Sequence, residues 1–380
     1  MNVNRIGKFL LKLVVSLFMK ERCEEKASRV NSAWGKDFVT ALLQWNHYEN
    51  NRQMPWKGEK DPYKIWLSEI MLQQTRVEQG LKYYQNFIEA FPDIDALAKA
   101  PEAKVFKLWE GLGYYSRCRN LIATAHFISK GLNGVFPNTY EEILALKGIG
   151  NYTAAAIGSF AFNLPYAVLD GNVFRVLSRI FDIEIPIDST QGKKTFSALA
   201  QQILPKKEGR EYNQAIMDFG ATICKPIPNC DDCFFHKKCL AYLRGKQQLL
   251  PAKEKKIKTR KRWLNYFIVQ KGHSVLIQQR REKDIWQGLY QFVLIETHKN
   301  CRRQQLEELF RKQYGLENYV VTDEWKEKQV LSHQNIFFHF LTFKVERREK
   351  VENYSWEKLA QLQELAFPKT LHQVIKAKLL

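Results

Sequence analysis

The apolar residues change their spacing once along this chain of 380 residues, and that change predicts a multidomain fold. From Trp34 to about Tyr242 they recur at intervals of three and four, as on the buried faces of helices. From Trp263 onward, apolar runs at 263–270, 273–280, 290–296 and 335–346 read as strands, the first two forming a hairpin at Lys271-Gly272. Residues 301–315 read as a helix ended by Gly315, and the C-terminus reads as helical. We expect an all-α domain followed by an α+β domain.

The junction between these halves is strongly basic. Residues 253–262 hold seven basic side chains and one acid, within a chain that carries 59 Lys and Arg against 40 Asp and Glu, a net charge of +19. This excess indicates a polyanionic partner, with nucleic acid ahead of an anionic membrane. The junction reads equally as a solvated linker or as a clamp on phosphates. The apolar run 9–19 is too short to span a membrane.

Four of the seven cysteines fall within 16 residues. They are Cys224, Cys230, Cys233 and Cys239, in the spacing C-x5-C-x2-C-x5-C. Such a cluster is typical of a metal site in a reducing compartment rather than of a secreted disulfide framework. Zinc sites with four cysteines usually use two CxxC pairs, whereas this chain has one CxxC between longer arms. The spacing therefore favours a single 4Fe–4S cluster over zinc.

A glycine turn at residues 146–154, LKGIGNYTA, lies between two predicted helices. Gly148 and Gly150 allow the backbone to approach a ligand closely, and the following helix begins there with its positive dipole end. This arrangement predicts a phosphate-binding hairpin that needs no side-chain charge.

Two carboxylates stand in settings that suit acid–base chemistry. Glu69 has Trp66 and Leu72 as helical neighbours, so burial would raise its pKa, although an idle residue at the helix edge fits nearly as well. Asp170 follows an apolar run and precedes a helix that carries Arg175 and Arg179. From that segment alone, Asp170 is better explained as an N-cap.

Together these segments resemble the helix-hairpin-helix DNA glycosylases and, within them, the adenine glycosylases of the MutY family. The resemblance covers nearly everything from Trp34 to Leu380 and depends on motifs in a fixed order. They are Pro55-Trp56, DPYKIWLSEIMLQQTRV at 61–77, GLGYYSRCRNL at 111–121, LKGIGNYTAAAI at 146–157, LDGNVFRVLSR at 169–179, and the cysteine cluster.

The resemblance implies a role for each catalytic position. Glu69 would protonate adenine and later handle the attacking water, and Asp170 would stabilise the cationic sugar. Tyr152 and Asn172 match supporting positions. Tyr152 stands where the related endonuclease III proteins carry a lysine nucleophile, so a monofunctional glycosylase is expected.

The resemblance also implies contacts with DNA. With it, the net charge of +19 reads as a duplex DNA footprint spread over the cluster loop, the arginines after Asp170 (Arg175 and Arg179) and the basic linker. Gln74 and Tyr114 match residues that wedge into the base stack, and Gly148 and Gly150 match the hairpin. The C-terminal half resembles a Nudix-like recognition domain through DIWQGLYQF at 284–292, and within LSHQNI at 331–336 the pair Ser332-His333 matches readers of 8-oxoguanine. Two features depart from the family: the first cysteine gap is x5 rather than x6, and the recognition loop begins with Leu331 rather than an aromatic residue.

The expected organisation follows from these matches. It comprises a basic extension at 1–31, a helix-hairpin-helix catalytic domain at 32–223, a cluster loop at 224–243, a basic linker at 244–262 and a Nudix-like domain at 263–380. The expected enzyme is a monomer that excises adenine opposite 8-oxoguanine or guanine in duplex DNA, with no membrane partner, in a bacterial cytoplasm at the nucleoid. The alternatives are an endonuclease III-like glycosylase of another damaged base and a non-catalytic DNA-binding iron–sulfur sensor.

Overall fold

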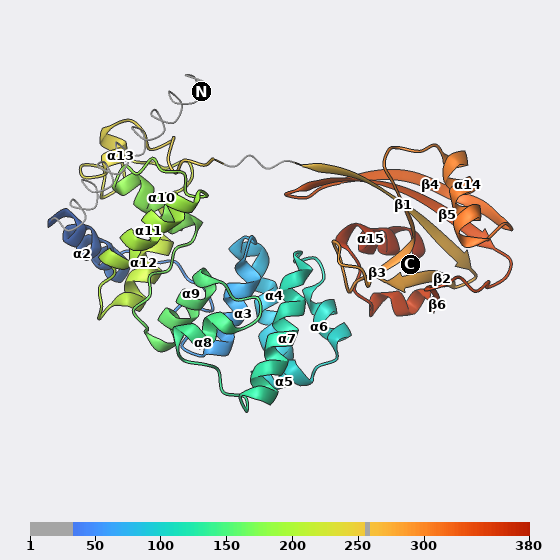
Figure 1. Ribbon diagram of the computed structural model, residues 1–380, viewed down its shortest axis with the longest axis horizontal. Coiled ribbons are helices and arrows are strands. Elements are labelled where there is room, and N and C mark those ends of the chain that lie inside the picture. Colours follow the sequence, from blue (N-terminus) through green and yellow to red (C-terminus); the bar gives the residue numbers. More distant parts are fainter. Residues whose placement is uncertain (1–32, 255–258) are drawn as a thin grey trace, which may run out of the picture. The chain divides into compact units, whose positions relative to one another are not determined.

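The structure is a computed structural model that describes residues 33–254 and 259–380 (Figure 1). The predicted basic extension and its apolar run lie outside these residues. The described residues form two compact units, each made of two stretches of the chain: residues 33–69 belong with 136–254, and residues 70–135 belong with 259–380. The helical half is therefore shared between the units, and the predicted domain boundaries stay predictions. Across the two described ranges, no helix has the length and hydropathy to cross a membrane.

The first unit is helical and is built around aromatic side chains. Phe38, Trp45 and Phe219 are buried in its core, and the rings of Trp45 and Phe219 meet edge to face at 5.7 Å. Its helices are α2 (Ala33–Tyr48), α8 (Tyr140–Ala145), α9 (Asn151–Phe162), α10 (Gly171–Ile180), α11 (Thr190–Ile203), α12 (Gly209–Thr222) and α13 (Leu240–Leu243), with the first part of α3 (Pro62–Leu72). Each of these large rings buries a large apolar area, beside the aliphatic side chains of the same core.

The cysteine-rich loop is anchored in this same core. Phe235, between the third and fourth clustered cysteines, is 2% exposed. Its ring lies 5.0 Å from that of Phe38 and 5.4 Å from that of Phe219. An apolar side chain thus fixes a loop that is otherwise rich in turns.

The second unit begins with four helices and ends with a sheet domain. The helices are α4 (Val77–Ala90), α5 (Ile94–Lys99), α6 (Glu102–Trp109) and α7 (Tyr115–Gly131). Trp109 is fully buried, and its ring meets that of Phe87 edge to face at 5.7 Å. Asp93 begins α5 with a side-chain hydrogen bond from the amide of Ala96, as an N-cap should.

The sheet has six strands in the order β4-β5-β1-β3-β2-β6. Its strands are β1 (Arg260–Lys271), β2 (Ser274–Gln279), β3 (Tyr290–Thr297), β4 (Tyr319–Val330), β5 (Gln334–Val345) and β6 (Ser355–Lys358). Strands β1 and β5 are parallel, and all other neighbours are antiparallel. The remaining elements are α14 (Arg303–Tyr314), the 3-10 helix η1 (Leu359–Gln363), α15 (Lys369–Val374) and the terminal π-helix η2 (Ile375–Leu379).

Each face of the sheet has its own aromatic packing. Helix α14 lies against one face (Figure 1), where the ring of Phe310 packs 4.6 Å from Phe267 and 4.8 Å from Phe343. The neighbouring residue in β1, Tyr266, points the other way and stacks 5.7 Å from Phe340. This alternation is the period of two that the sequence predicts for this half.

The predicted fold class is confirmed, with differences in detail. Strands β1 and β2 pair as a hairpin only at two positions, because β3 lies between them in the sheet. The sequence prediction missed β4 and β6. Strand β4 has no buried residue and carries many charges, so its pattern is that of an exposed edge rather than of a core strand. Strand β1 begins at Arg260, inside the segment predicted as a linker.

Candidate active site

Glu69 lies on α3 with its side chain turned into the protein. The helix begins at Pro62, and the preceding Asp61 accepts a hydrogen bond from the amide of Tyr63 at 2.9 Å, as expected for an N-cap followed by proline. Ile65 and Trp66, one turn before Glu69, are buried, and Glu69 itself is 8% exposed. Burial raises the pKa of Glu69 to about 7. A carboxyl group near neutrality can both give and take a proton at physiological pH.

Tyr152, in the first turn of α9, is the hydrogen-bond partner of that carboxyl group. Burial, and then the nearby charges of Glu69 and Asp170, hold the pKa of Tyr152 well above its ordinary value. The phenol is therefore neutral and donates to Glu69. This bond favours the ionised form of Glu69 and partly opposes the effect of burial on its pKa.

Asp170 is the N-cap of α10, and its negative charge adds to the rise in the pKa of Glu69. It accepts hydrogen bonds from the amide of Val173 and the side-chain amide of Asn172, both at 2.7 Å. Burial raises its pKa, and these hydrogen bonds act in the opposite direction. The N-cap prediction and the active-site prediction thus describe the same residue. Glu69, Tyr152, Asp170 and Asn172 are brought together.

A chain of hydrogen bonds leads from Asp170 to the cysteine-rich loop. The carbonyl oxygen of the Asn172 side chain accepts from Arg175 Nη2 at 2.8 Å, and Arg175 also donates to the backbone oxygens of Gly220 (2.7 Å) and Cys224 (2.8 Å). A Cβ at Gly220 would lie 2.7 Å from that of Asn172, so α12 approaches α10 this closely only with glycine.

The four clustered cysteines line one small cavity together with Arg179 and His236. All four carry free thiols, and no carboxylate lines the cavity. This set of sulfur donors fits the ligand set of an iron–sulfur cluster. Within 33–254 and 259–380, no three His, Cys, Asp or Glu groups are close enough to hold a single metal ion.

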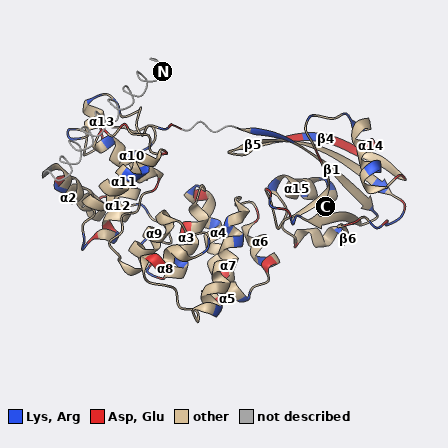
Figure 2. Cartoon of the chain, viewed as in Figure 1, with Lys and Arg blue, Asp and Glu red and all other residues tan. Residues whose placement is uncertain are grey.

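The arginines after Asp170 are not free for phosphates, which corrects the expectation that they form part of a DNA footprint. Arg179 is 2% exposed. It donates to the backbone oxygens of Lys225 (2.6 Å), Pro226 (2.9 Å) and Leu250 (3.0 Å). Arginine is used here to satisfy loop carbonyls. The basic residues that remain exposed are spread over both units (Figure 2).

The predicted wedge residues both sit in strained backbone. Gln74 has a φ of 57° and Tyr114 has a φ of 48°, values that residues other than glycine rarely adopt. Arg117, which sequence reasoning missed, organises the loop before Gln74: it is buried and donates to the backbone oxygens of Ile70, Met71 and Gln73 at 2.7 to 2.9 Å. Its position three residues after Tyr114, on the buried face of α7, was the available signal.

The hairpin glycines lie between α8 and α9 as predicted. Gly148 has φ of 83°, and Gly150 is the N-cap of α9, a helix of 12 residues. Both glycines are exposed. The amino end of α9 therefore faces solvent, as a backbone phosphate site requires.

Ser332 and His333 occupy the turn between β4 and β5. Ser332 Oγ lies 3.3 Å from His333 Nδ1 and 3.1 Å from the hydroxyl of Tyr114, and all three side chains are exposed. Within the second unit, the predicted wedge and the predicted base readers are therefore brought together at one surface.

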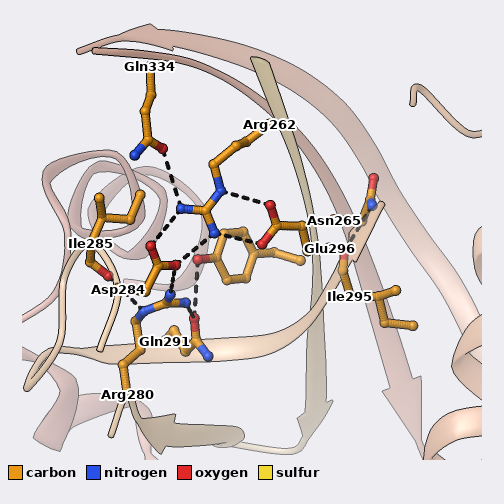
Figure 3. Close-up of polar contacts among 10 residues, drawn as sticks. Arg262, Asn265, Arg280, Asp284, Ile285, Gln291, Ile295, Glu296 and Gln334 are labelled. Atoms are coloured by element: carbon orange, nitrogen blue, oxygen red, sulfur yellow. Dashed lines mark hydrogen bonds and ion pairs between the residues drawn. The ribbon is translucent and has the colours of Figure 1, made fainter. Parts of the chain in front are cut away.

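A hydrogen-bond network centred on the buried Arg262 connects to this turn through Gln334 (Figure 3). Arg262, 5% exposed, forms paired hydrogen bonds with Asp284 (2.7 and 2.8 Å) and with Glu296 (2.6 and 2.7 Å), and also donates to Gln334 beside His333. These hydrogen bonds raise the pKa of Arg262. Arg262 was predicted as part of the basic linker, but its charge is neutralised inside the protein.

Comparisons with known proteins show which families this chain is similar to. The HhH-GPD superfamily of base excision DNA repair proteins matches residues 67–206, and the NUDIX domain matches residues 265–377. The adenine DNA glycosylase of Buchnera aphidicola subsp. Baizongia pistaciae (strain Bp) is 40% identical over 259 residues, covering 67% of this chain and 73% of that protein.

A second adenine DNA glycosylase, from Buchnera aphidicola subsp. Schizaphis graminum (strain Sg), is 30% identical over 352 residues, covering 89% of this chain and 98% of that protein. A solved thermostable thymine-DNA glycosylase is 28% identical with a TM-score of 0.52, and the match covers 57% of this chain and 99% of that one. The chain therefore belongs to the adenine DNA glycosylase family, enzymes of base excision repair that hydrolyse N-glycosyl bonds, and joins a helix-hairpin-helix domain to a Nudix-like domain.

Proposed function

We propose that this protein is a monofunctional DNA glycosylase that removes adenine paired with 8-oxoguanine, and with guanine, from duplex DNA. The observation that carries the proposal is the buried Glu69 with its pKa raised to about 7, hydrogen-bonded to Tyr152 and next to Asp170. Two carboxyl groups whose surroundings differ in this way can divide the roles of acid and counter-charge between them.

The chemistry requires the adenine to leave the base stack and enter the protein. Glu69 then gives its proton to a ring nitrogen of adenine, and the C1′–N bond breaks with its electron pair leaving on the base. The sugar becomes a cation that the Asp170 carboxylate stabilises, while Asn172 holds that carboxylate through its 2.7 Å hydrogen bond. Water adds to C1′, and the Glu69 carboxylate takes the released proton. The products are free adenine and an abasic site.

The absence of lyase action follows from the residue at position 152. A neutral phenol with a raised pKa cannot form a Schiff base with the sugar, as a lysine there would. Borohydride should therefore trap no covalent complex between the protein and substrate DNA. A trapped complex in the wild-type protein would contradict the monofunctional assignment.

Duplex DNA is the proposed partner of both units, bound by a monomer at the bacterial nucleoid in the cytoplasm. The amino end of α9, with Gly148 and Gly150, would hold a backbone phosphate. Gln74 and Tyr114 would enter the base stack, and Ser332 and His333 would hydrogen-bond the 8-oxoguanine opposite the adenine. The adjacency of Tyr114 and Ser332 supports this assignment.

One 4Fe–4S cluster is the proposed cofactor, held by Cys224, Cys230, Cys233 and Cys239. When bound, such a cluster would cross-link the loop that carries the backbone oxygens bound by Arg175 and Arg179. Iron and sulfide analysis should give about four of each per chain. Stoichiometric zinc in a colourless protein would overturn the assignment.

The deciding experiment is a strand-nicking assay with hot alkali. Matched duplexes would carry adenine opposite 8-oxoguanine, adenine opposite guanine, thymine opposite guanine, or thymine glycol. We expect alkali-dependent nicks at adenine only, fastest opposite 8-oxoguanine. Release of thymine or thymine glycol without release of adenine would favour a glycosylase of another base. Binding without release of any base would favour a non-catalytic sensor.

A further inference from the structure

One carboxylate of the second unit joins two segments that are far apart in the chain. Glu110 follows α6, and its side chain is 11% exposed. It accepts a hydrogen bond from the backbone amide of Phe367, 257 residues away, at 2.7 Å. Its other contacts are Lys107 Nζ at 2.9 Å and His372 Nδ1 at 3.2 Å. Both segments belong to the same compact unit.

Further contacts between the same segments surround Glu110. Lys107 also donates to the backbone oxygen of Leu365 at 3.0 Å, and Arg119 of α7 donates to the backbone oxygen of Gln287 at 2.7 Å. Gly288 has φ of 93°, and a Cβ there would lie 2.9 Å from the ring of Phe106. The turn at 286–289 is thus shaped to accept α6 closely.

These contacts are of a kind that fixes orientation. A carboxylate taken out of water costs free energy unless its oxygens are satisfied, and Glu110 is satisfied only in part by its own helix, through Lys107. Lys107 and Arg119 each donate to a backbone oxygen, and Glu110 accepts from a backbone amide. Backbone groups cannot swing away as side chains can. Charge-assisted bonds of this type are stronger and more directional than neutral ones.

We infer that Glu110 is a positioning residue that docks the C-terminal sheet domain onto the helices α6 and α7. Tyr114 is the N-cap of helix α7, and Ser332 lies in the docked domain. The hydroxyl groups of Tyr114 and Ser332 lie 3.1 Å apart. The docking therefore places Tyr114 and Ser332 so that both can contact the same base before DNA binds. Discrimination of 8-oxoguanine from guanine depends on this placement. The inference rests on the proposed reading of 8-oxoguanine by Ser332 and His333.

The test compares the wild-type protein with Glu110→Ala, Glu110→Gln and the control Glu102→Ala. Glu102 is an exposed glutamate on the same helix, so its loss makes the same change in net charge. The first readout is the ratio of single-turnover adenine excision rates opposite 8-oxoguanine and opposite guanine. We expect Glu110→Ala to reduce that ratio about tenfold, through the 8-oxoguanine rate alone, which corresponds to one charge-assisted bond. Glu110→Gln keeps an acceptor for Phe367 and should fall between.

The second readout is amide hydrogen exchange in peptides covering 285–289 and 365–373. Exchange there should speed up in Glu110→Ala while the rest of the protein and its melting temperature stay unchanged. Wild-type exchange together with a wild-type rate ratio in Glu110→Ala would overturn the inference, as would an equal loss of both rates. A wild-type protein with no preference for 8-oxoguanine would contradict the proposed function instead, and exchange alone would then decide the docking role of Glu110.

Discussion

The two candidate sites of this protein differ most in their contact with water. In the first unit, Glu69 is 8% exposed and has a phenol and a second carboxyl group as its polar partners. In the second unit, Tyr114 is 39% exposed, and Ser332 and His333 lie in an exposed turn. The first site buries a carboxyl group that can bind and release a proton. The second site exposes hydrogen-bonding groups that a partner molecule can contact.

This difference follows from what each site has to do. A carboxyl group can act as an acid at neutral pH only if its surroundings disfavour its charge, which requires burial. Groups that read a base must instead stay hydrated until the base replaces the water, so each hydrogen bond to the base adds little net free energy. Substitutions in the first site should therefore have large effects on rate and stability, and those in the second should have small effects confined to selectivity.

The largest effect should come from Glu69→Gln. The amide keeps the shape of the side chain but cannot give or take the proton, so adenine excision should fall by about 10³-fold, a typical contribution of general acid–base catalysis. Single-turnover rates on adenine opposite 8-oxoguanine and opposite guanine should fall together, and duplex binding should persist. Glu89→Gln, on the exposed face of α4, is the matched control. Full activity of Glu69→Gln would remove the assigned role.

The same substitution should change how stability depends on pH. In the unfolded chain Glu69 ionises near 4.5, and in the folded protein near 7, so the folded state holds the extra proton between these values. Its contribution to stability is complete below 4.5 and is lost as pH rises to about 7. Relative to wild type, Glu69→Gln should gain about 2 to 3 kcal/mol of unfolding free energy between pH 5 and pH 8. Denaturant unfolding of both proteins at each pH measures it. A constant difference would mean that Glu69 titrates normally.

The excision rate itself should follow the protonation of Glu69. Because the acid form is required, the wild-type single-turnover rate should be level below the pKa of about 7 and fall about tenfold per pH unit well above it. Tyr152→Phe removes the hydrogen bond that favours the carboxylate and should move this fall to higher pH. A profile that is flat to pH 9 would contradict proton donation by Glu69.

The sequence was informative where chemistry and local structure coincide. The change of apolar period predicted the helical and sheet halves. The spacing of Trp66 and Leu72 left burial of Glu69 and an idle place at the helix edge nearly even, and the structure buries the side chain. Asp170 had two competing explanations, and the structure satisfies both, because the N-cap hydrogen bonds also hold the carboxylate that faces Glu69.

The arginines show where sequence reasoning stopped. Arg175, Arg179 and Arg262 were all assigned to a DNA footprint because the charge was visible and the partners were not. Arg175 binds a carbonyl oxygen 49 residues away, and Arg262 binds a carboxylate 34 residues away. Such partners are fixed by tertiary packing. The division of the helical half between two units likewise depends on contacts of residues 70–135 that no local pattern records.

The smallest effect should come from Ser332→Ala, and it tests the exposed site directly. Loss of one hydroxyl that hydrogen-bonds a base should lower the excision rate opposite 8-oxoguanine about two- to tenfold, the range for a single neutral hydrogen bond. The rate opposite guanine and the melting temperature should not change, because the turn is exposed and its fold depends on Arg262 and Gln334 rather than on this side chain. Ser355→Ala, at an exposed position of β6, is the control. Equal losses on both duplexes would show that Ser332 supports binding in general, and the contrast between a closed chemical site and an open reading site would then no longer hold.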